Sequence, residues 1–242
     1  MNAVPPPVPQ FEKPAYVEGR IAALLRAPSQ IGQDLADGKD VFRSGVYFLV
    51  TALVLHAIFG FAVGLFGGLS VGLMAAVKTP LIAACSLLLC FPSLYVFSSV
   101  GGAPLKLGQT FMLGTSCLAM VGVLLIGLAP VAWLFAVSTE SLPFVVMLIF
   151  VLWMVSVAFA VRYINKLKEV PLFRRTSGIG AWFVIFALVS LQMTTCLRPL
   201  LGKPDPARGW WTSEKKFFLA HYGSTFDDEK PPVNRPVNNK GK

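Results

Sequence analysis

The chain has 242 residues, of which 55% are apolar and only 14% are charged. Because about a quarter of the residues in a soluble domain are charged, this composition excludes a water-soluble globule. The formal net charge is +9, but the bases fall in the segments around the apolar runs, and we expect no nucleic-acid partner.

The first predicted region is the amino-terminal arm, residues 1–45. Residues 1–14 are rich in proline and are predicted to be extended. Residues 16–27 place an apolar face beside two arginines, which is typical of an amphipathic helix at a membrane interface. The face consists of Ile21, Leu24 and Leu25, and the arginines are Arg20 and Arg26. A second short helix, or a turn, is predicted over residues 29–40. The arm lacks the apolar core of a cleavable signal peptide, so we expect the first span to be an uncleaved anchor.

Five apolar runs dominate residues 46–198. About 20 apolar residues, rising about 1.5 Å each, cross a hydrocarbon core of roughly 30 Å. The runs that meet this rule are residues 46–66, 81–100, 111–137, 143–163 and 179–197, and the second can start earlier, within residues 71–77. No acid or base lies in them well away from a terminus. Backbone groups in lipid must be satisfied within the segment, so helices are predicted. We therefore expect an all-α polytopic membrane protein with five transmembrane helices, an amphipathic amino-terminal segment and extended tails.

The first span carries small residues at intervals of four, which share one helical face. With one histidine among them, these positions are Ala52, His56, Gly60, Gly64, Gly68 and Gly72. Such a stripe lets another backbone approach closely, and van der Waals contact then drives association. We predict helix packing through Ala52, Gly60, Gly64 and Gly68, tightest at Gly60 and Gly64, with a helix of this chain or of another. The last glycine can instead mark a turn.

His56 lies near the centre of the first span, and an ionisable residue in the membrane is a functional hypothesis by default. With Ala52 four residues before it, His56 resembles the chlorophyll-binding spacing of bacterial light-harvesting polypeptides. This makes it a candidate ligand for a chlorophyll-type pigment or heme. The alternatives are a neutral histidine that bonds a carbonyl or hydroxyl of a neighbouring helix, and a proton relay. We expect the structural role and no cofactor.

Two prolines, Pro92 and Pro130, lie in mid-span and are predicted to kink their helices. Kinks bracket substrate cavities in transporters and also occur in purely structural helices, which is the interpretation we favour. The four cysteines form no CxxC pair, and with only two histidines they predict no zinc or iron–sulfur site. The sequence holds no Walker loop, no HExxH, no GxSxG with its partners and no pair of carboxylates near a span. We therefore expect no enzyme.

The distribution of bases predicts the orientation. With five spans, the amino-terminal side holds eleven bases and the other side ten. Short loops weigh more than long tails; the fourth loop holds five bases, whereas the first holds only Lys78 and the third none. We therefore expect a cytoplasmic amino terminus, in a bacterial inner membrane, and a carboxyl tail across it. A sixth span within residues 66–80, or a fifth segment that only dips in, would put both tails in the cytoplasm.

The carboxyl-terminal tail, residues 199–242, carries two aromatic pairs. Trp210 and Trp211 are typical of the headgroup belt beside a span. Phe217 and Phe218 fall where one or two turns of surface helix are predicted, and they would dip into lipid or dock on a partner. A docking tail and a plain disordered tail both fit the composition.

Several motifs occur in a characteristic order. They are LLRAPSQIGQDL before the first span, KTP and LLLCFPSLYVFSSVGG around the second, LGQT and APVAW at the two ends of the third, and a basic loop before the fifth. This arrangement, over residues 20–202, resembles the bacterial branch of the Yip1-like family of five-helix membrane proteins. The resemblance implies five helices and a cytoplasmic amino end. Eukaryotic members are linked to small GTPases and vesicle traffic, but their DLYGP-type signature is missing here, so that role is not carried over.

Taken together, these features predict a non-enzymatic scaffold or accessory subunit of a larger membrane complex, with lipids and other membrane subunits as partners. Two alternatives stay open. The first is a small transporter or lipid-handling protein centred on the kinks at Pro92 and Pro130, which a continuous polar cavity between those helices would favour. The second is a pigment- or heme-binding subunit that uses His56.

Overall fold

The computed structural model describes residues 19–38, 40–103, 105–139, 142–174 and 178–196, and their regular structure is entirely helical. The elements in chain order are α1 (Arg20–Arg26), α2 (Pro28–Asp37), α3 (Val41–Gly64), η1 (Leu65–Gly67), α4 (Leu69–Val100), α5 (Leu107–Ser138), α6 (Leu142–Leu167), η2 (Pro171–Phe173) and α7 (Ile179–Cys196). The prediction of an all-α chain is confirmed for this part of the molecule.

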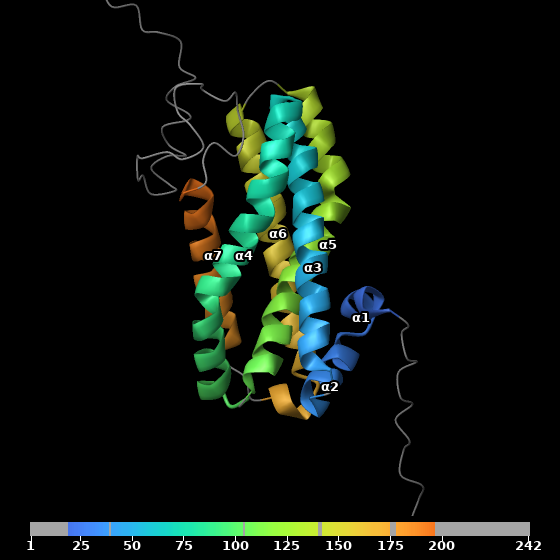
Figure 1. Cartoon of the computed structure of the whole chain (residues 1–242), viewed down its shortest axis with the longest axis vertical. Coiled ribbons are helices and arrows are strands. Elements are labelled where there is room, and N and C mark those ends of the chain that lie inside the picture. Colours follow the sequence, from blue (N-terminus) through green and yellow to red (C-terminus); the bar gives the residue numbers. More distant parts are fainter. Residues whose placement is uncertain (1–18, 39, 104, 140–141, 175–177, 197–242) are drawn as a thin grey trace, which may run out of the picture.

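Within the described ranges, four helices are long and apolar enough to cross a membrane: α3, α4, α5 and α6. Figure 1 shows them as an up-and-down bundle, with α7 alongside α4. Helix α7 is apolar but has only 18 residues. At about 1.5 Å per residue it reaches about 27 Å, slightly less than the hydrocarbon core of roughly 30 Å. By length and composition, the four long helices are thus candidate membrane spans, and α7 packs beside α4.

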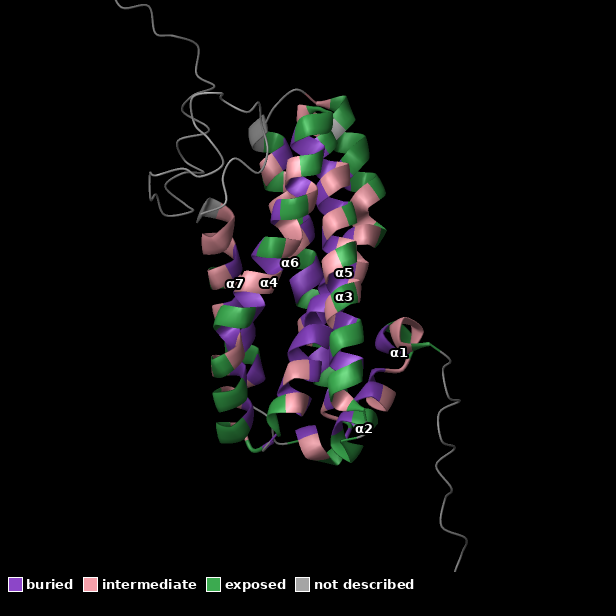
Figure 2. Cartoon of the chain, viewed as in Figure 1, coloured by how far each residue is buried: buried purple, intermediate pink, exposed green. Residues whose placement is uncertain are grey.

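Helix α5 forms the centre of the bundle. All residues from 112 to 122 are buried, because α3, α4 and α6 pack around this helix. Figure 2 shows exposed residues along the outward faces of the bundle. Many of these outward side chains are large and apolar, such as Leu88 of α4 and Leu188 of α7. An apolar outer surface of this extent is suited to lipid.

The turn between the first two spans lies earlier than predicted. It is formed by η1 and Gly68, whose φ of +101° lies in the region that favours glycine. Helix α4 therefore begins at Leu69, and Pro80 lies in its interior. The expectation that Lys78 lies in a loop and that the spans hold no interior charge is wrong, since Lys78 is in α4 and only 3% exposed. The alternative of a separate sixth span within residues 66–80 is also excluded.

Helices α1 and α2 lie at one side of the base of the bundle, the end at which α3, α5 and α7 begin (Figure 1). Leu24 and Leu35 are fully buried. The side-chain amide of Gln109 donates to the carbonyl of Leu35 at 2.7 Å, which ties α2 to the start of α5. Gly32 of α2 lies against Val170, just after α6. The predicted amphipathic segment thus turns much of its apolar face toward protein.

Candidate functional site

The glycine face of α3 packs on α4. A Cβ atom built on Gly60 would lie 2.6 Å from the carbonyl oxygen of Ala75, and also against the side chain of Thr79. One built on Gly64 would lie 2.8 Å from the Cα of Gly72. Real Cβ atoms essentially never approach so closely, so only glycine permits this backbone contact. The partner is thus another helix of the same chain.

The two ends of the predicted stripe have other roles. Gly68 forms the turn, and nothing lies within 4 Å of its Cβ position. Gly72 lies in α4 and forms part of the surface that α3 meets. Ala52 is fully buried. The repeat in the sequence therefore runs across a hairpin and does not follow one helix face throughout.

His56 is bonded to its own helix. Its Nδ1 lies 2.7 Å from the carbonyl oxygen of Ala52, so this nitrogen carries the proton and donates it. The ring is 4% exposed and faces Gly122 of α5, where a built Cβ would lie 3.1 Å from Nδ1. The expected carbonyl partner exists, but in α3 rather than in a neighbouring helix. A macrocycle at this ring would have to displace protein that already covers it.

Both mid-span prolines face outward. Pro92 of α4 and Pro130 of α5 are exposed, so the kinks do not face each other across the bundle interior. Polar groups between α5 and α6 bond locally. The Tyr163 hydroxyl donates to Ser116 Oγ at 3.2 Å, and Ser116 Oγ donates to the carbonyl of Leu113 at 2.8 Å. These side chains link helices and do not line an open path.

Helix α7 is anchored on α4 through Trp182. Its indole Nε1 donates to the carbonyl of Cys90 at 2.9 Å, two residues before Pro92. The ring is 1% exposed and stacks on Phe186, with the centroids 5.3 Å apart. The start of α7 also lies close to α4, since a Cβ built on Gly178 would lie 2.9 Å from the carbonyl oxygen of Phe97. No sequence pattern predicts this contact, because Trp182 and Cys90 are 92 residues apart.

The remaining predicted sites give less geometry. Trp210, Trp211, Phe217 and Phe218 lie outside the described residues. Cys85, Cys90 and Cys117 are free thiols. Within the described part of the chain, no three histidine, cysteine or carboxylate side chains gather as a metal would require.

A cavity of about 230 Å³ opens at the base of the bundle, between the α1–α2 pair and α3. Buried apolar side chains, among them Phe48 of α3 and Met112 of α5, form part of its wall. Its polar lining comes from Arg20, Gln30, Asp34, Asp40 and Ser44. The cavity is therefore mixed in character, with one cation and two carboxylates around a partly apolar wall.

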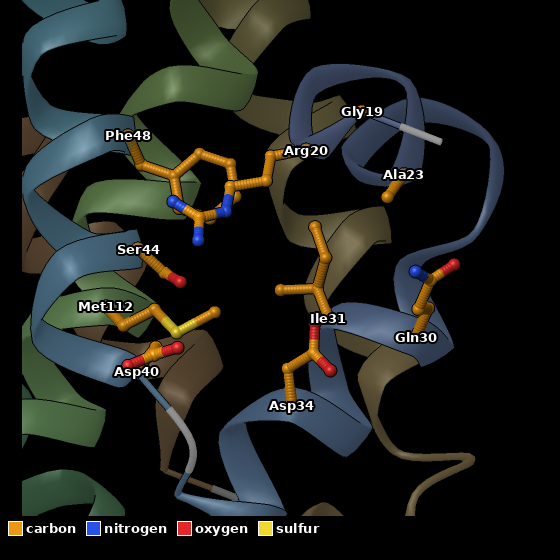
Figure 3. Close-up of a pocket in the computed structure, with 10 residues that line it drawn as sticks. All are labelled: Gly19, Arg20, Ala23, Gln30, Ile31, Asp34, Asp40, Ser44, Phe48 and Met112. Atoms are coloured by element: carbon orange, nitrogen blue, oxygen red, sulfur yellow. The ribbon is translucent and has the colours of Figure 1, made fainter. Parts of the chain in front are cut away.

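The charges in this cavity come from three helix segments. Figure 3 shows the Arg20 side chain reaching toward Phe48 and Ser44, with Asp40 beyond Ser44 on α3 and Asp34 across from it on α2. The Arg20 guanidinium also lies over the ring of Tyr47, 5.4 Å from its centroid. Asp34 and Asp40 are exposed, and Arg20 is half-buried. A ligand could thus reach both kinds of charge from outside.

Asp40 joins α2 to α3 in a conformation that is rare for its residue type. Its φ of +48° makes it the one positive-φ residue other than glycine in the described ranges. Aspartate tolerates this region better than most residues. In the sequence, Arg20 is recognisable only as a flank of the amphipathic face, and no local pattern predicts the cavity, because its walls come from four helices.

Comparisons with protein-family models, with curated proteins and with solved structures find no match for this chain.

Proposed function

We propose that the chain is a non-enzymatic integral membrane subunit, a scaffold or accessory protein that acts by contact with other membrane proteins. The observation that carries this proposal is the filled interior. Residues 112–122 of α5 are buried without a break, and the kink prolines face outward. A bundle with a packed centre presents its surfaces and its two ends to partners, whereas a transporter needs a path through the protein.

We further propose five crossings, with α7 as the fifth, and a cytoplasmic amino terminus. Eight described bases lie at the end that carries α1 and α2: Arg20, Arg26, Arg43, Lys106, Arg162, Lys166, Lys168 and Arg174. In the described residues toward the opposite end, Lys78 is the one base, and it is buried inside α4. Lysine and arginine are enriched in the short loops on the cytoplasmic side of a membrane. The resemblance to the Yip1-like family implies the same topology.

Cysteine labelling in whole cells tests this orientation. We expect a membrane-impermeant maleimide to label Ser138→Cys in intact cells, and Glu169→Cys only after the membrane is opened. The unmodified chain, with its native cysteines, is the control. The reverse pattern would overturn the orientation. A tag after Lys242 should be reached from outside if α7 crosses, and only in opened cells if it does not.

Gentle detergent extraction of the tagged full-length chain tests the subunit role. We expect a native-gel band heavier than the chain alone, containing one or more other membrane proteins in fixed stoichiometry by mass spectrometry. The absorption spectrum of the same fraction tests the pigment alternative, because a heme or chlorophyll band that disappears in His56→Leu would establish it. A lone colourless chain would contradict the subunit role and put the transporter alternative first.

A further inference from the structure

We propose that the cavity at the base of the bundle binds the headgroup of a phospholipid that carries a primary ammonium group, as phosphatidylethanolamine does. The proposal rests on the membrane placement of the bundle and is independent of the subunit role. It combines three observations: where the cavity lies, how its charges are ordered, and which donors and acceptors line it.

The cavity lies at the level expected for headgroups. Asp40 directly precedes the first residue of α3, and the outward side chains of the next two turns include Phe42, Arg43 and Tyr47. Exposed aromatic and basic residues at the start of a span are typical of the membrane–water interface. Leu25 of α1 is 44% exposed and gives the α1–α2 pair its own contact with lipid. A lipid in this leaflet would therefore meet the cavity with its polar end.

The order of charges matches an ethanolamine headgroup. Asp40 lies at the water end of α3, whereas Tyr47 and Phe48, next to the Arg20 guanidinium, lie seven and eight residues further along the helix. At about 1.5 Å per residue, Ser44 lies about 6 Å and Phe48 about 12 Å beyond Asp40 along α3. The Arg20 side chain reaches toward these two residues, so the cation lies deeper than the Asp40 carboxylate. In a phospholipid, the phosphate is attached to the glycerol and lies deeper than the terminal amine. Arg20 would thus meet the phosphate, and Asp34 and Asp40 would meet the ammonium.

The chemistry of the lining favours this headgroup over other common ones. A guanidinium binds phosphate oxygens through a planar set of N–H donors. Carboxylates form strong charge-assisted hydrogen bonds with an ammonium that carries N–H groups. The trimethylammonium of phosphatidylcholine has no N–H donor, and phosphatidylglycerol has no cation to set against Asp40. We therefore expect ethanolamine lipid to bind more tightly than either.

Native mass spectrometry of the delipidated full-length chain tests the proposal. The chain is titrated with dioleoyl phosphatidylethanolamine, phosphatidylcholine and phosphatidylglycerol, which share the same acyl chains. A single charge-assisted hydrogen bond corresponds to a preference of about tenfold or more for the ethanolamine lipid. Equal retention of the three lipids, or a preference for phosphatidylglycerol through the basic surface, would overturn the proposal. This comparison needs no variant.

Charge variants assign the preference to the cavity. In the double variant Asp34→Asn/Asp40→Asn, we expect the affinity for ethanolamine lipid to fall about tenfold, to the affinity for phosphatidylcholine. Arg20→Gln should weaken the binding of both lipids to a similar extent, because both carry the phosphate. The matched controls are Asp37→Asn and Arg26→Gln, which change exposed charges of α2 and α1 outside the cavity. Controls that reduce binding as much as the cavity variants would contradict the assignment.

A soluble competitor identifies the source of the headgroup. Phosphoethanolamine carries the same phosphate and ammonium without acyl chains. We expect it to displace the lipid only at concentrations far above that of the lipid, because the acyl chains add apolar contact. Binding of phosphoethanolamine as tight as that of the lipid would show that the cavity serves a soluble molecule, and it would overturn the lipid proposal.

Discussion

Helix α4 is held from two sides by different means. On the α3 side, Gly60 and Gly64 let the backbones of the two helices approach closely. On the α7 side, Trp182 fills the interface and bonds to a carbonyl. In lipid, helices gain no hydrophobic driving force from association, so close packing and hydrogen bonds must hold them together. At the first contact the helices approach closely because glycine has no side chain, and at the second a large side chain fills the space between them.

The largest effect is expected at the glycine contact. Gly60→Leu would place a side chain against the backbone of Ala75, and we expect it to cost about 3 kcal/mol of unfolding free energy. The measurement is an SDS titration of the detergent-solubilised chain, followed by circular dichroism. The matched control is Gly127→Leu, because nothing lies within 4 Å of the Cβ position of Gly127 in α5.

The control itself sharpens this test. A leucine has a higher helix propensity than glycine, by up to about 1 kcal/mol, so Gly127→Leu should be neutral or slightly stabilising. If Gly60→Leu behaves like Gly127→Leu, the close α3–α4 contact is wrong. A loss of native-gel partners with unchanged unfolding would instead show that the glycines face another chain.

A smaller effect is expected at the tryptophan contact. Trp182→Phe keeps an aromatic ring but removes the bond to the Cys90 carbonyl, at a cost of about 1–2 kcal/mol. Because α7 packs on the side of the bundle, hydrogen exchange should rise in α7 and remain unchanged in α3. Trp133→Phe, at a half-exposed position of α5, should change neither. Equal changes in both helices would mean that α7 is part of the central unit.

A third contact, between α5 and α6, is a hydrogen bond between two side chains. Tyr163→Phe removes the hydroxyl that donates to Ser116, and we expect a loss of about 0.5–1 kcal/mol. The effect is small because Ser116 keeps its own bond to Leu113. A double-mutant cycle with Ser116→Ala measures the pair directly. A coupling energy near zero would show that the two hydroxyls do not interact.

The smallest effect is expected at Ser86 of α4. Its hydroxyl is fully buried and finds no hydrogen-bond partner among the described residues. Removing an unpaired buried polar group relieves its desolvation cost, so Ser86→Ala should be neutral or stabilising by up to about 1 kcal/mol. The SDS titration again provides the measurement. Destabilisation by this variant would indicate a partner that the helix packing does not supply.

The sequence by itself determined the helices. Apolar runs of membrane length must be helical in lipid, and the four long helices fall on four of the five predicted runs. The spacing of Gly60 and Gly64 also predicted a close contact, because residues four apart share a face. Such features depend on local composition and periodicity, which a single segment carries within itself.

The tertiary structure decided which surfaces meet. The glycine contact is intramolecular because the turn at Gly68 folds α4 back onto α3, and the same early turn puts Lys78 inside a helix. Trp182 finds Cys90 across 92 residues of sequence. The basal cavity joins Arg20, Asp34, Asp40 and Met112, which no local pattern relates. Packing partners depend on turn geometry and register over the whole chain, so hydropathy and spacing predicted the spans without predicting their neighbours.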